Sequence, residues 1–309
     1  MRYNYTKRLL VLDNDNINPL KDSLEIQGEF FFLEELYDSD VRIRGGNSFI
    51  FRAVHPDGSP NYIVKFSRYL SNTQRPSEIK RNERFQKEIE ALWKASASPE
   101  RDCVVGVIDD GRFELGMGIY LRYYVMEEAD ANLRKFLREN QLSQPAKILL
   151  CRQLLAGLNA LHGIDIYHRD IKPENILIIG NRWKFGDLGL ISYRNEHPDP
   201  DHFDEKVGPT GFLSPEATNK AFGNRKCQNF DFDCLIDASS DLFQLGQLFW
   251  FILQDEVPIG QISIADFKCA HAGIFNNIIE RMLQYPKNRR PSINDLEVAF
   301  QPILQEFGL

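Results

Sequence analysis

Residues 168–175, His-Arg-Asp-Ile-Lys-Pro-Glu-Asn, decide the fold of this 309-residue chain. Asp187-Leu188-Gly189 begins twelve residues after Asn175, and Ser214-Pro215-Glu216 follows further along. A carboxylate can orient a hydroxyl and accept its proton, and carboxylate or amide oxygens suit Mg²⁺. A single one of these groups would be an ordinary surface turn. The ordered series instead indicates a catalytic site.

The series resembles the protein kinase family, whose catalytic loop, metal-binding element and later Pro-Glu element follow one another in this order. The resemblance covers roughly residues 40–300. It implies an α+β, two-lobed protein kinase fold, with a small β-rich N-lobe and a larger helical C-lobe. It also implies that the γ-phosphoryl group of ATP is transferred to protein hydroxyls, in the manner of the serine/threonine type.

Each residue of the series takes an expected role from this resemblance. Asp170 is the catalytic carboxylate that orients and deprotonates the acceptor hydroxyl. Lys172 resembles the serine/threonine-type lysine that contacts the γ-phosphate. Asn175 and Asp187 are the expected Mg²⁺ ligands. His168 resembles a packed core residue and not a base.

Upstream, Lys65 in Tyr62-Ile-Val-Lys resembles the strand lysine that contacts the α- and β-phosphates. A helix is predicted over residues 78–96, and its apolar face favours Glu88 over Glu83 and Glu90 as the ion-pair partner of Lys65. The apolar positions of that face are Ile79, Phe85, Ile89 and Leu92.

The glycine-rich loop is the weakest match. The family pattern expects glycines near positions 43, 45 and 48, where this chain has Ile43, Gly45 and Ser48. We expect Gly45, Gly46 and Ser48 to contact the phosphates, because glycine and serine permit tight turns. Viewed alone, the segment is equally compatible with an ordinary hairpin turn.

The nucleotide site is completed by residues around the predicted hinge. Met126 resembles the gatekeeper, and the backbones of Glu127 and Ala129 are expected to hydrogen-bond adenine. Asp130 or Asn132 is expected near the ribose. The other residues that we assign to the nucleotide site are Ile50, Ile63 and Leu177.

Three further residues resemble architectural positions of the family. Asp241 is expected to brace the backbone of the catalytic loop. Arg290 is expected to pair with Glu216. Thr210 lies one place away from the family's usual register, and a contact with Asp170 and Lys172 is expected but its register is open.

The activation segment suggests a regulatory hypothesis. In the family, the arginine before the catalytic aspartate, here Arg169, often pairs with a phosphate carried by this segment. A carboxylate offers an arginine the same two-oxygen partner. We hypothesise that an acid occupies the place of the phosphate, the alternative being a merely solvated loop. The candidates are Glu196, Asp199, Asp201, Asp204 and Glu205.

The chain changes character near residue 129. Antiparallel strands are predicted within residues 41–66, at 104–108 and at 119–126, and a helix at 145–162. We therefore divide the chain into an extension of unknown role (1–36), an N-lobe (37–128) and a C-lobe (129–309). The lobes form one kinase domain over about residues 37–305.

The composition is that of an ordinary globular protein. The net charge of −7 makes a general nucleic-acid or membrane binder unlikely, so neither partner is expected. The five cysteines form no paired motif, and no apolar stretch has the length of a signal-peptide core or a membrane span. We expect a cytoplasmic protein that binds ATP, Mg²⁺ and protein substrates, with self-association possible for autophosphorylation.

Two other functions stay open at this stage. A pseudokinase would bind nucleotide and serve as a scaffold; the eroded glycine loop favours it, and the intact Lys65, Asp170, Asn175 and Asp187 argue against it. A small-molecule kinase would share the fold, but the Lys172–Asn175 and Ser214–Glu216 elements favour a protein acceptor.

Overall fold

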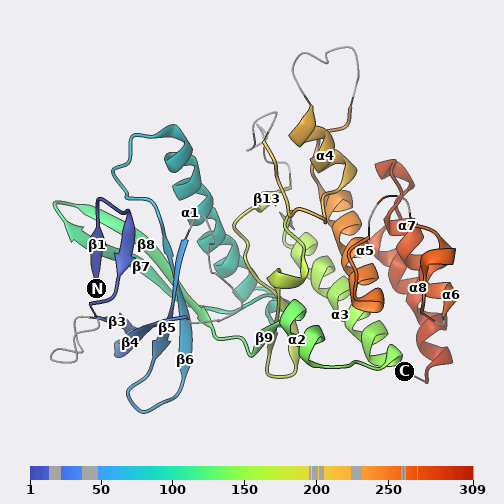
Figure 1. Cartoon of the computed structure of the whole chain (residues 1–309), viewed down its shortest axis with the longest axis horizontal. Helices are drawn as coiled ribbons and strands as arrows, with labels where there is room; N and C mark the ends of the chain where they lie inside the picture. The colour runs from blue at the N-terminus through green and yellow to red at the C-terminus, as the bar shows by residue number, and fades with distance from the viewer. Residues whose placement is uncertain are drawn as a thin grey trace. The chain divides into compact units, whose positions relative to one another are not determined.

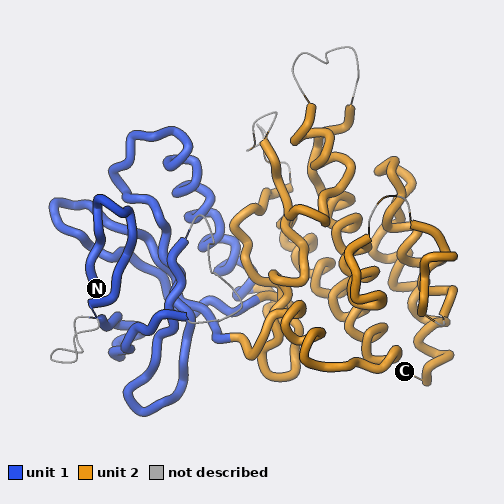
Figure 2. Tube along the Cα trace, in the orientation of Figure 1, with its two compact units in different colours: residues 1–97, 105–128 blue, residues 98–104, 129–309 orange. Residues whose placement is uncertain are grey.

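The computed structural model of the chain describes residues 1–13, 22–36, 48–194, 196, 201, 205–223, 232–258, 260, 262–269 and 271–308. The chain forms two compact units, residues 1–97 with 105–128 and residues 98–104 with 129–309 (Figure 2). The division after Glu128 coincides with the one placed from the sequence. The short segment 98–104 belongs to the second unit, which the sequence did not indicate.

The first unit contains a six-stranded antiparallel sheet with the strand order β3-β4-β5-β6-β8-β7 (Figure 1). Its strands are β3 (Ser23–Ile26), β4 (Glu29–Glu35), β5 (Ser48–Val54), β6 (Asn61–Ser67), β7 (Val107–Gly116) and β8 (Ile119–Glu127). The strand predicted at 104–108 begins later and is longer. It lies at the edge of the sheet, where polar residues such as Asp109 and Asp110 can face solvent.

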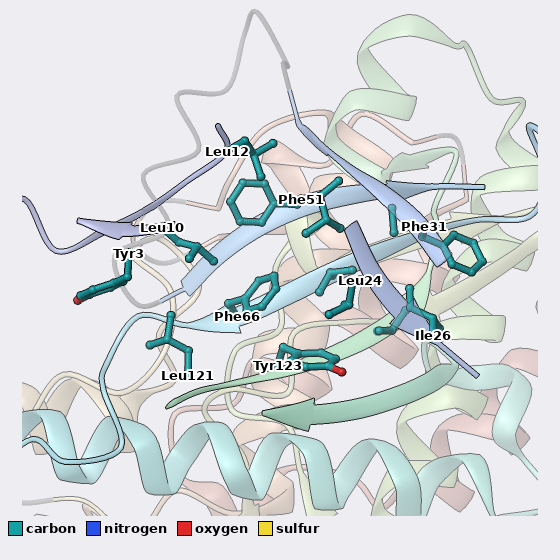
Figure 3. Close-up of a cluster of buried hydrophobic side chains, with 14 residues drawn as sticks. Tyr3, Leu10, Leu12, Leu24, Ile26, Phe31, Phe51, Phe66, Leu121 and Tyr123 are labelled. Carbon is teal, nitrogen blue, oxygen red and sulfur yellow. The ribbon is translucent and has the colours of Figure 1, made fainter. Parts of the chain in front are cut away.

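The first 36 residues, an extension of unknown role in the sequence analysis, group with the first unit. β1 (Arg2–Asn4) and β2 (Leu9–Val11) pair as a hairpin, and β3 and β4 extend the main sheet. The hairpin places Tyr3, Leu10 and Leu12 in the same buried cluster as side chains of the sheet (Figure 3). Burying these apolar side chains stabilises the hairpin against the sheet.

Helix α1 (Pro76–Ser96) begins with a proline in its first turn, where a backbone N–H would have no intrahelical acceptor, so no hydrogen bond is lost. The helix predicted over 78–96 is therefore confirmed. Phe85, Ile89 and Leu92 are buried as predicted, but Ile79 is 39% exposed. Ile79 lines an open hollow together with Tyr69 and Tyr120, so the apolar face that packs begins only at Phe85.

The second unit is mostly helical, and α3 packs against α5 and α8. The predicted helix at 145–162 is α3, which begins after Ser143, whose hydroxyl accepts a hydrogen bond from the Ala146 amide. The α-helices are α2 (Leu133–Glu139), α3 (Gln144–Gly163), α4 (Pro215–Phe222), α5 (Ala238–Gln254), α6 (Ala272–Ile274), α7 (Glu280–Met282) and α8 (Ile293–Glu306). A π-helix, η5 (Phe275–Ile279), joins α6 to α7.

Short strands and 3₁₀ turns of the second unit position the catalytic loop. One sheet has the order β12-β11-β9, and β10 pairs with β13. The strands are β9 (Ala131–Asn132), β10 (Ile166–Tyr167), β11 (Ile176–Ile179), β12 (Arg182–Phe185) and β13 (Ser192–Tyr193). The turns are η2 (Arg101–Cys103), η3 (Pro173–Asn175), η4 (Ile264–Asp266) and η6 (Lys287–Arg289). None of the helices in the described part of the chain has the length and apolar character needed to cross a bilayer.

The predicted pairing of Glu216 with Arg290 is confirmed. The Arg290 Nη2 and Nη1 atoms lie 2.6 and 3.1 Å from the two carboxylate oxygens of Glu216. Both residues are buried, and Ser240 Oγ donates to the same carboxylate at 3.0 Å. Arg290 also donates to the carbonyl oxygens of Gln284, Ser239 and Tyr285. The pair therefore ties α4 to α5 and to the segment before α8.

We predict that Glu216→Ala and Arg290→Ala each lower the free energy of unfolding by about 3–5 kcal/mol, because each leaves a buried charge without its partner. The double variant loses less than the sum of the two single losses. Denaturant unfolding of the four proteins in the cycle measures this. Additive losses would mean that the two side chains are not coupled.

Candidate functional site

In the first unit, β6 carries Lys65 and α1 carries Glu88. Lys65 Nζ lies 2.8 Å from Glu88 Oε1, and both residues are almost fully buried. The pair predicted from the sequence is thus present, whereas Glu83 and Glu90 lie on the exposed side of α1. A buried ammonium held by a buried carboxylate has a fixed position, which is the requirement for a phosphate-binding lysine.

Tyr124 is a third member of this cluster, and the sequence analysis missed its role. Its hydroxyl donates to Glu88 Oε1 at 2.8 Å, and Lys65 Nζ lies 5.7 Å from the centre of its ring. Tyr124 is directly opposite Lys65 in the pairing of β6 with β8. Strand register would have located it, once β8 was known to neighbour β6.

The other nucleotide-site residues of the first unit lie around the same strands. Ile50 is paired with Lys65 across β5 and β6, and Ile63 is paired with Met126 across β6 and β8. The Glu127 amide donates to the Gly106 carbonyl at 3.0 Å. Their contacts with nucleotide stay predictions.

The structure describes only one of the three residues predicted to form the glycine loop, Ser48. Ser48 opens β5 opposite Ser67. Gly45 and Gly46 lie outside the described residues, so their role stays a prediction.

Ala129, Asp130 and Asn132 belong to the second unit. The Asp130 carboxylate accepts a hydrogen bond from the Gly180 amide, and Asn132 caps α2 by accepting from the Lys135 amide. Both side chains therefore have structural partners, and a ribose contact would compete with these bonds.

In the second unit, Asp241 at the start of α5 holds the catalytic loop. Its two oxygens accept hydrogen bonds from the amides of His168 and Arg169 at 2.8 and 2.7 Å, and its side chain is fully buried. His162 Nε2 lies 3.0 Å from the same carboxylate. The bracing role expected for Asp241 therefore has the predicted geometry.

Gln244, one turn further along α5, contacts the same loop and was not found from the sequence. Its amide oxygen accepts from the Ile171 amide at 3.0 Å, and its amide nitrogen donates to the Arg169 carbonyl at 3.2 Å. His168 is fully buried, packs against the Phe185 ring in a tilted arrangement and has Nε2 3.2 Å from the Gly186 carbonyl oxygen. The predicted packing role of His168 fits these contacts.

Asp170 lies at the centre of a small hydrogen-bonded cluster. Lys172 Nζ and Asn175 Nδ2 both reach Asp170 Oδ2, at 2.7 and 2.8 Å. Asn175 Nδ2 also donates to the Asp170 carbonyl at 2.9 Å. Burial raises the pKa of the Asp170 carboxyl, the positive charge of Lys172 lowers it, and the negative charge of Asp187 raises it. The loop therefore holds the carboxylate in one place with one oxygen engaged.

Asn175 and Asp187 fit the Mg²⁺ role expected of them. Within the described residues, no donor binds Asn175 Oδ1, the atom that a metal ion would take, and the Asp187 side chain is on an exposed residue. The described part of the chain contains no group of three or more His, Cys, Asp or Glu residues placed so that they could hold a metal ion. Two oxygen ligands suit Mg²⁺, which keeps waters and binds phosphates.

The turn that carries Asp187 is tightly constrained. The Gly186 amide donates to the Asn175 carbonyl at 2.8 Å, and a Cβ at Gly186 would lie 2.8 Å from Leu177 Cδ1. Leu177 thus packs directly under this turn. Asp187 has φ of +54° and Arg169 has φ of +67°. Such backbone is unfavourable for a side-chain-bearing residue by about 1–3 kcal/mol and concentrates at functional sites.

Arg169 forms an ion pair with Asp201 of the activation segment. The two side chains are 3% and 2% exposed. A solvated loop, the alternative considered from the sequence, does not describe Asp201. Asp199 and Asp204 lie outside the described residues.

Thr210 does not make the contact expected of it. Its hydroxyl accepts a hydrogen bond from Lys206 and the residue is exposed. In the described segments, no hydrogen bond joins Thr210 to Asp170 or Lys172. The one-place shift in register is accommodated by two glycines, Gly208 and Gly211, with φ of +109° and +90°. A Cβ at Gly208 would lie 3.1 Å from the Arg169 carbonyl, so this position requires glycine.

Comparison with known proteins gives the same assignment. Residues 44–299 match the protein kinase domain family. The chain belongs to the protein kinase family. The family uses ATP and typically a divalent metal ion, and it acts on protein substrates.

Several relatives are serine/threonine kinases by name. The chain is 30% identical over 257 residues to the serine/threonine-protein kinase cds1 of Schizosaccharomyces pombe, covering 81% of this chain and 51% of that protein. It is 26% identical to a probable serine/threonine-protein kinase of Encephalitozoon cuniculi over 68% of this chain and 34% of that protein. A bovine phosphorylase b kinase gamma catalytic chain is 28% identical over 74% of this chain and 52% of its own length. The chain therefore spans about half the length, or less, of these relatives.

We predict that Lys172→Met shifts the acidic limb of the kcat/KM profile to higher pH. Asp170 acts as a carboxylate, so activity falls as the pH drops through its raised pKa. Removing the positive charge of Lys172 raises that pKa further. Initial rates measured from about pH 5 to about pH 9 define the acidic limb of the kcat/KM profile.

Lys172→Arg is the matched control, because it keeps the charge. Its acidic limb stays near that of the unmodified enzyme even where kcat falls. An acidic limb that does not move in Lys172→Met would show that Lys172 does not tune Asp170.

Proposed function

We propose that this chain is a serine/threonine protein kinase that transfers the γ-phosphoryl group of MgATP to hydroxyl groups of proteins. The observation that carries the proposal is the Asp170–Lys172–Asn175 hydrogen-bond cluster on a loop whose backbone is held by Asp241 and Gln244. Phosphoryl transfer depends mainly on positioning and on offsetting negative charge, and this loop supplies a positioned carboxylate beside a positioned cation.

Each residue has a definite task in this mechanism. The Asp170 carboxylate accepts a hydrogen bond from the acceptor hydroxyl, aims its oxygen at the phosphorus and takes its proton. Lys172, already 2.7 Å from Asp170, offsets the charge of the transferred group. Lys65, fixed by Glu88, binds the α- and β-phosphates of ATP. Mg²⁺ held by Asn175 and Asp187 would neutralise phosphate charge.

The wider setting is also part of the proposal. We expect a cytoplasmic enzyme that binds neither nucleic acid nor membranes, on the basis of its net charge and its apolar pattern. Its partners are protein substrates, and self-association accounts for any autophosphorylation. The serine/threonine preference is supported by Lys172 and by the names of two relatives.

The test is phosphate transfer by purified protein from γ-labelled ATP with Mg²⁺ to a generic basic protein. We predict that the unmodified chain transfers label, and that Asp170→Asn reduces transfer by about 10²-fold or more while ATP affinity changes little.

We predict that Asp187→Ala makes nucleotide binding insensitive to Mg²⁺, as measured by calorimetric titration.

Nucleotide binding without any transfer would instead identify a scaffold. Undiminished turnover by Asp170→Asn would contradict the catalytic assignment. Label on an aminoglycoside or another small hydroxyl compound, with none on protein, would place the chain among small-molecule kinases.

We also propose that this kinase is active without phosphorylation of its activation segment. The buried Arg169–Asp201 pair supports this, because a carboxylate fills the role of a phosphate next to the arginine that precedes Asp170. The Arg169 amide and carbonyl are bonded to Asp241 and Gln244, so the pair joins the activation segment to the braced loop.

We predict that phosphatase-treated enzyme of confirmed unmodified mass starts at its full rate, without a lag. Asp201→Asn lowers that rate by about tenfold, because it leaves Arg169 buried without its charged partner. Glu205→Gln removes the same charge from the segment and serves as the control, with little change expected. A lag followed by acceleration as phosphate is incorporated would reject the proposal.

A further inference from the structure

Glu78, in the first turn of α1, is the meeting point of several polar groups. Arg8 binds both carboxylate oxygens, with Nη1–Oε1 at 2.8 Å and Nη2–Oε2 at 3.2 Å. Thr73 Oγ1 donates to Oε2 at 2.6 Å, and Arg75 Nη1 donates to Oε1 at 3.2 Å. Glu78 is only 5% exposed. Hydrogen bonds from Arg8 first, and then from Thr73 and Arg75, outweigh the effect of burial and lower the pKa of Glu78 from its usual 4.5 to about 2, so the carboxylate is charged at neutral pH.

Arg8 is held on a rigid support. It is the last residue of the turn of the β1–β2 hairpin and has φ of +54°, a left-handed conformation that is unfavourable unless the surrounding structure holds it. Tyr3, Leu10 and Leu12 of this hairpin are buried with Phe51, Phe66 and Leu121 of the sheet (Figure 3). The guanidinium of Arg8 is therefore tied to the sheet through an apolar anchor.

The first half of α1 is attached to its surroundings mainly through polar side chains. Between Pro76 and Arg84, Glu78 is the one buried residue of the helix, and the next is Phe85. Beside this half lies an open hollow of about 480 Å³, lined by Tyr69, Ile79 and Tyr120 among others. Two further links are made by Asn82, which accepts from Ser67 and donates to the Leu70 carbonyl, and by Arg81, which donates to the Tyr69 hydroxyl and lies over its ring. Polar contacts, with the bidentate Arg8 pair foremost, hold the start of the helix.

The same helix carries Glu88, ten residues after Glu78 and about 15 Å further along the axis. A helix of this length moves largely as one body, so a tilt of its first turns displaces Glu88 from Lys65 Nζ and the Tyr124 hydroxyl. The position of the catalytic ion pair thus depends on what restrains the start of α1.

We propose that Arg8 is a positioning residue that holds α1 through Glu78 and thereby keeps Glu88 paired with Lys65. The N-terminal hairpin is then a brace for the nucleotide-binding lysine. This inference rests on the proposed function, because it assigns Lys65 to nucleotide binding. It gives the first 13 residues a role that their sequence alone did not reveal.

The first arm of the test compares Arg8→Met with Arg2→Met. Arg2 lies on the same hairpin and pairs with Asp13, but it is 75% exposed, so it controls for loss of a charge from the hairpin. Arg8→Met weakens ATP binding and raises the KM for ATP by about two- to tenfold, with a smaller change in kcat. Arg2→Met leaves both near their original values. Arg8→Lys, which keeps the charge but loses the two-pronged contact, falls between.

The second arm asks whether Arg8 acts through Glu88. In a Glu88→Gln background, where Lys65 has lost its charged partner, adding Arg8→Met produces little further loss of ATP affinity by calorimetry. A general loss of stability would persist in that background. Amide hydrogen exchange provides a readout that needs no nucleotide. Arg8→Met speeds exchange in residues 79–90 of α1 and leaves that of α5 unchanged.

The outcomes separate the two hypotheses. Unmodified protein that binds no ATP would overturn the proposed function, while the exchange data would still report on the brace. Unmodified protein that binds ATP, with Arg8→Met matching it in affinity and in exchange of α1, would overturn the brace alone. An equal Arg8→Met loss in both backgrounds would show that Arg8 does not act through Glu88.

Discussion

The buried carboxylate of Asp241 is the constraint on which the second unit depends. It is fully buried and accepts hydrogen bonds from two consecutive backbone amides, those of His168 and Arg169. A buried carboxylate without such donors would be strongly unfavourable, so loop and helix stabilise each other. Arg169 can then adopt its left-handed conformation, which turns the chain so that Asp170 follows in a fixed place.

A similar arrangement recurs in the first unit, where a buried acid on α1 fixes a residue on a strand. Glu88 holds Lys65 much as Asp241 holds the catalytic loop, in each case with a second donor, Tyr124 or His162. Charged groups buried in this way contribute little net stability, because their desolvation offsets their attraction. They define positions instead. Apolar burial around Phe66 and Leu245 stabilises the two units and offsets the cost of desolvating these buried charged groups.

Much of this arrangement could be predicted from the sequence, because the decisive residues are close together along the chain or follow in a fixed order. The 168–175 stretch indicated the family, and the spacing of Phe85, Ile89 and Leu92 selected Glu88 from three candidates. Other contacts depend on tertiary structure that no local pattern encodes. Gln244 meets the loop, and His162 meets Asp241, only through the packing of α5 and α3, and Tyr124 meets Lys65 only through strand register. Ile79 follows the helical period yet is exposed, because the neighbouring surface is hollow.

The Arg169–Asp201 pair has a consequence for how such an enzyme is controlled in time. A phosphate on an activation segment is added and removed by other enzymes, so it records recent signalling. Asp201 is a residue of the polypeptide itself, so its negative charge cannot be removed by a phosphatase. If the pair activates the kinase as proposed, switching the enzyme off would require separating Asp201 from Arg169 or removing the protein. Its output would follow the abundance of the chain and the supply of its substrates, with no memory of an upstream signal.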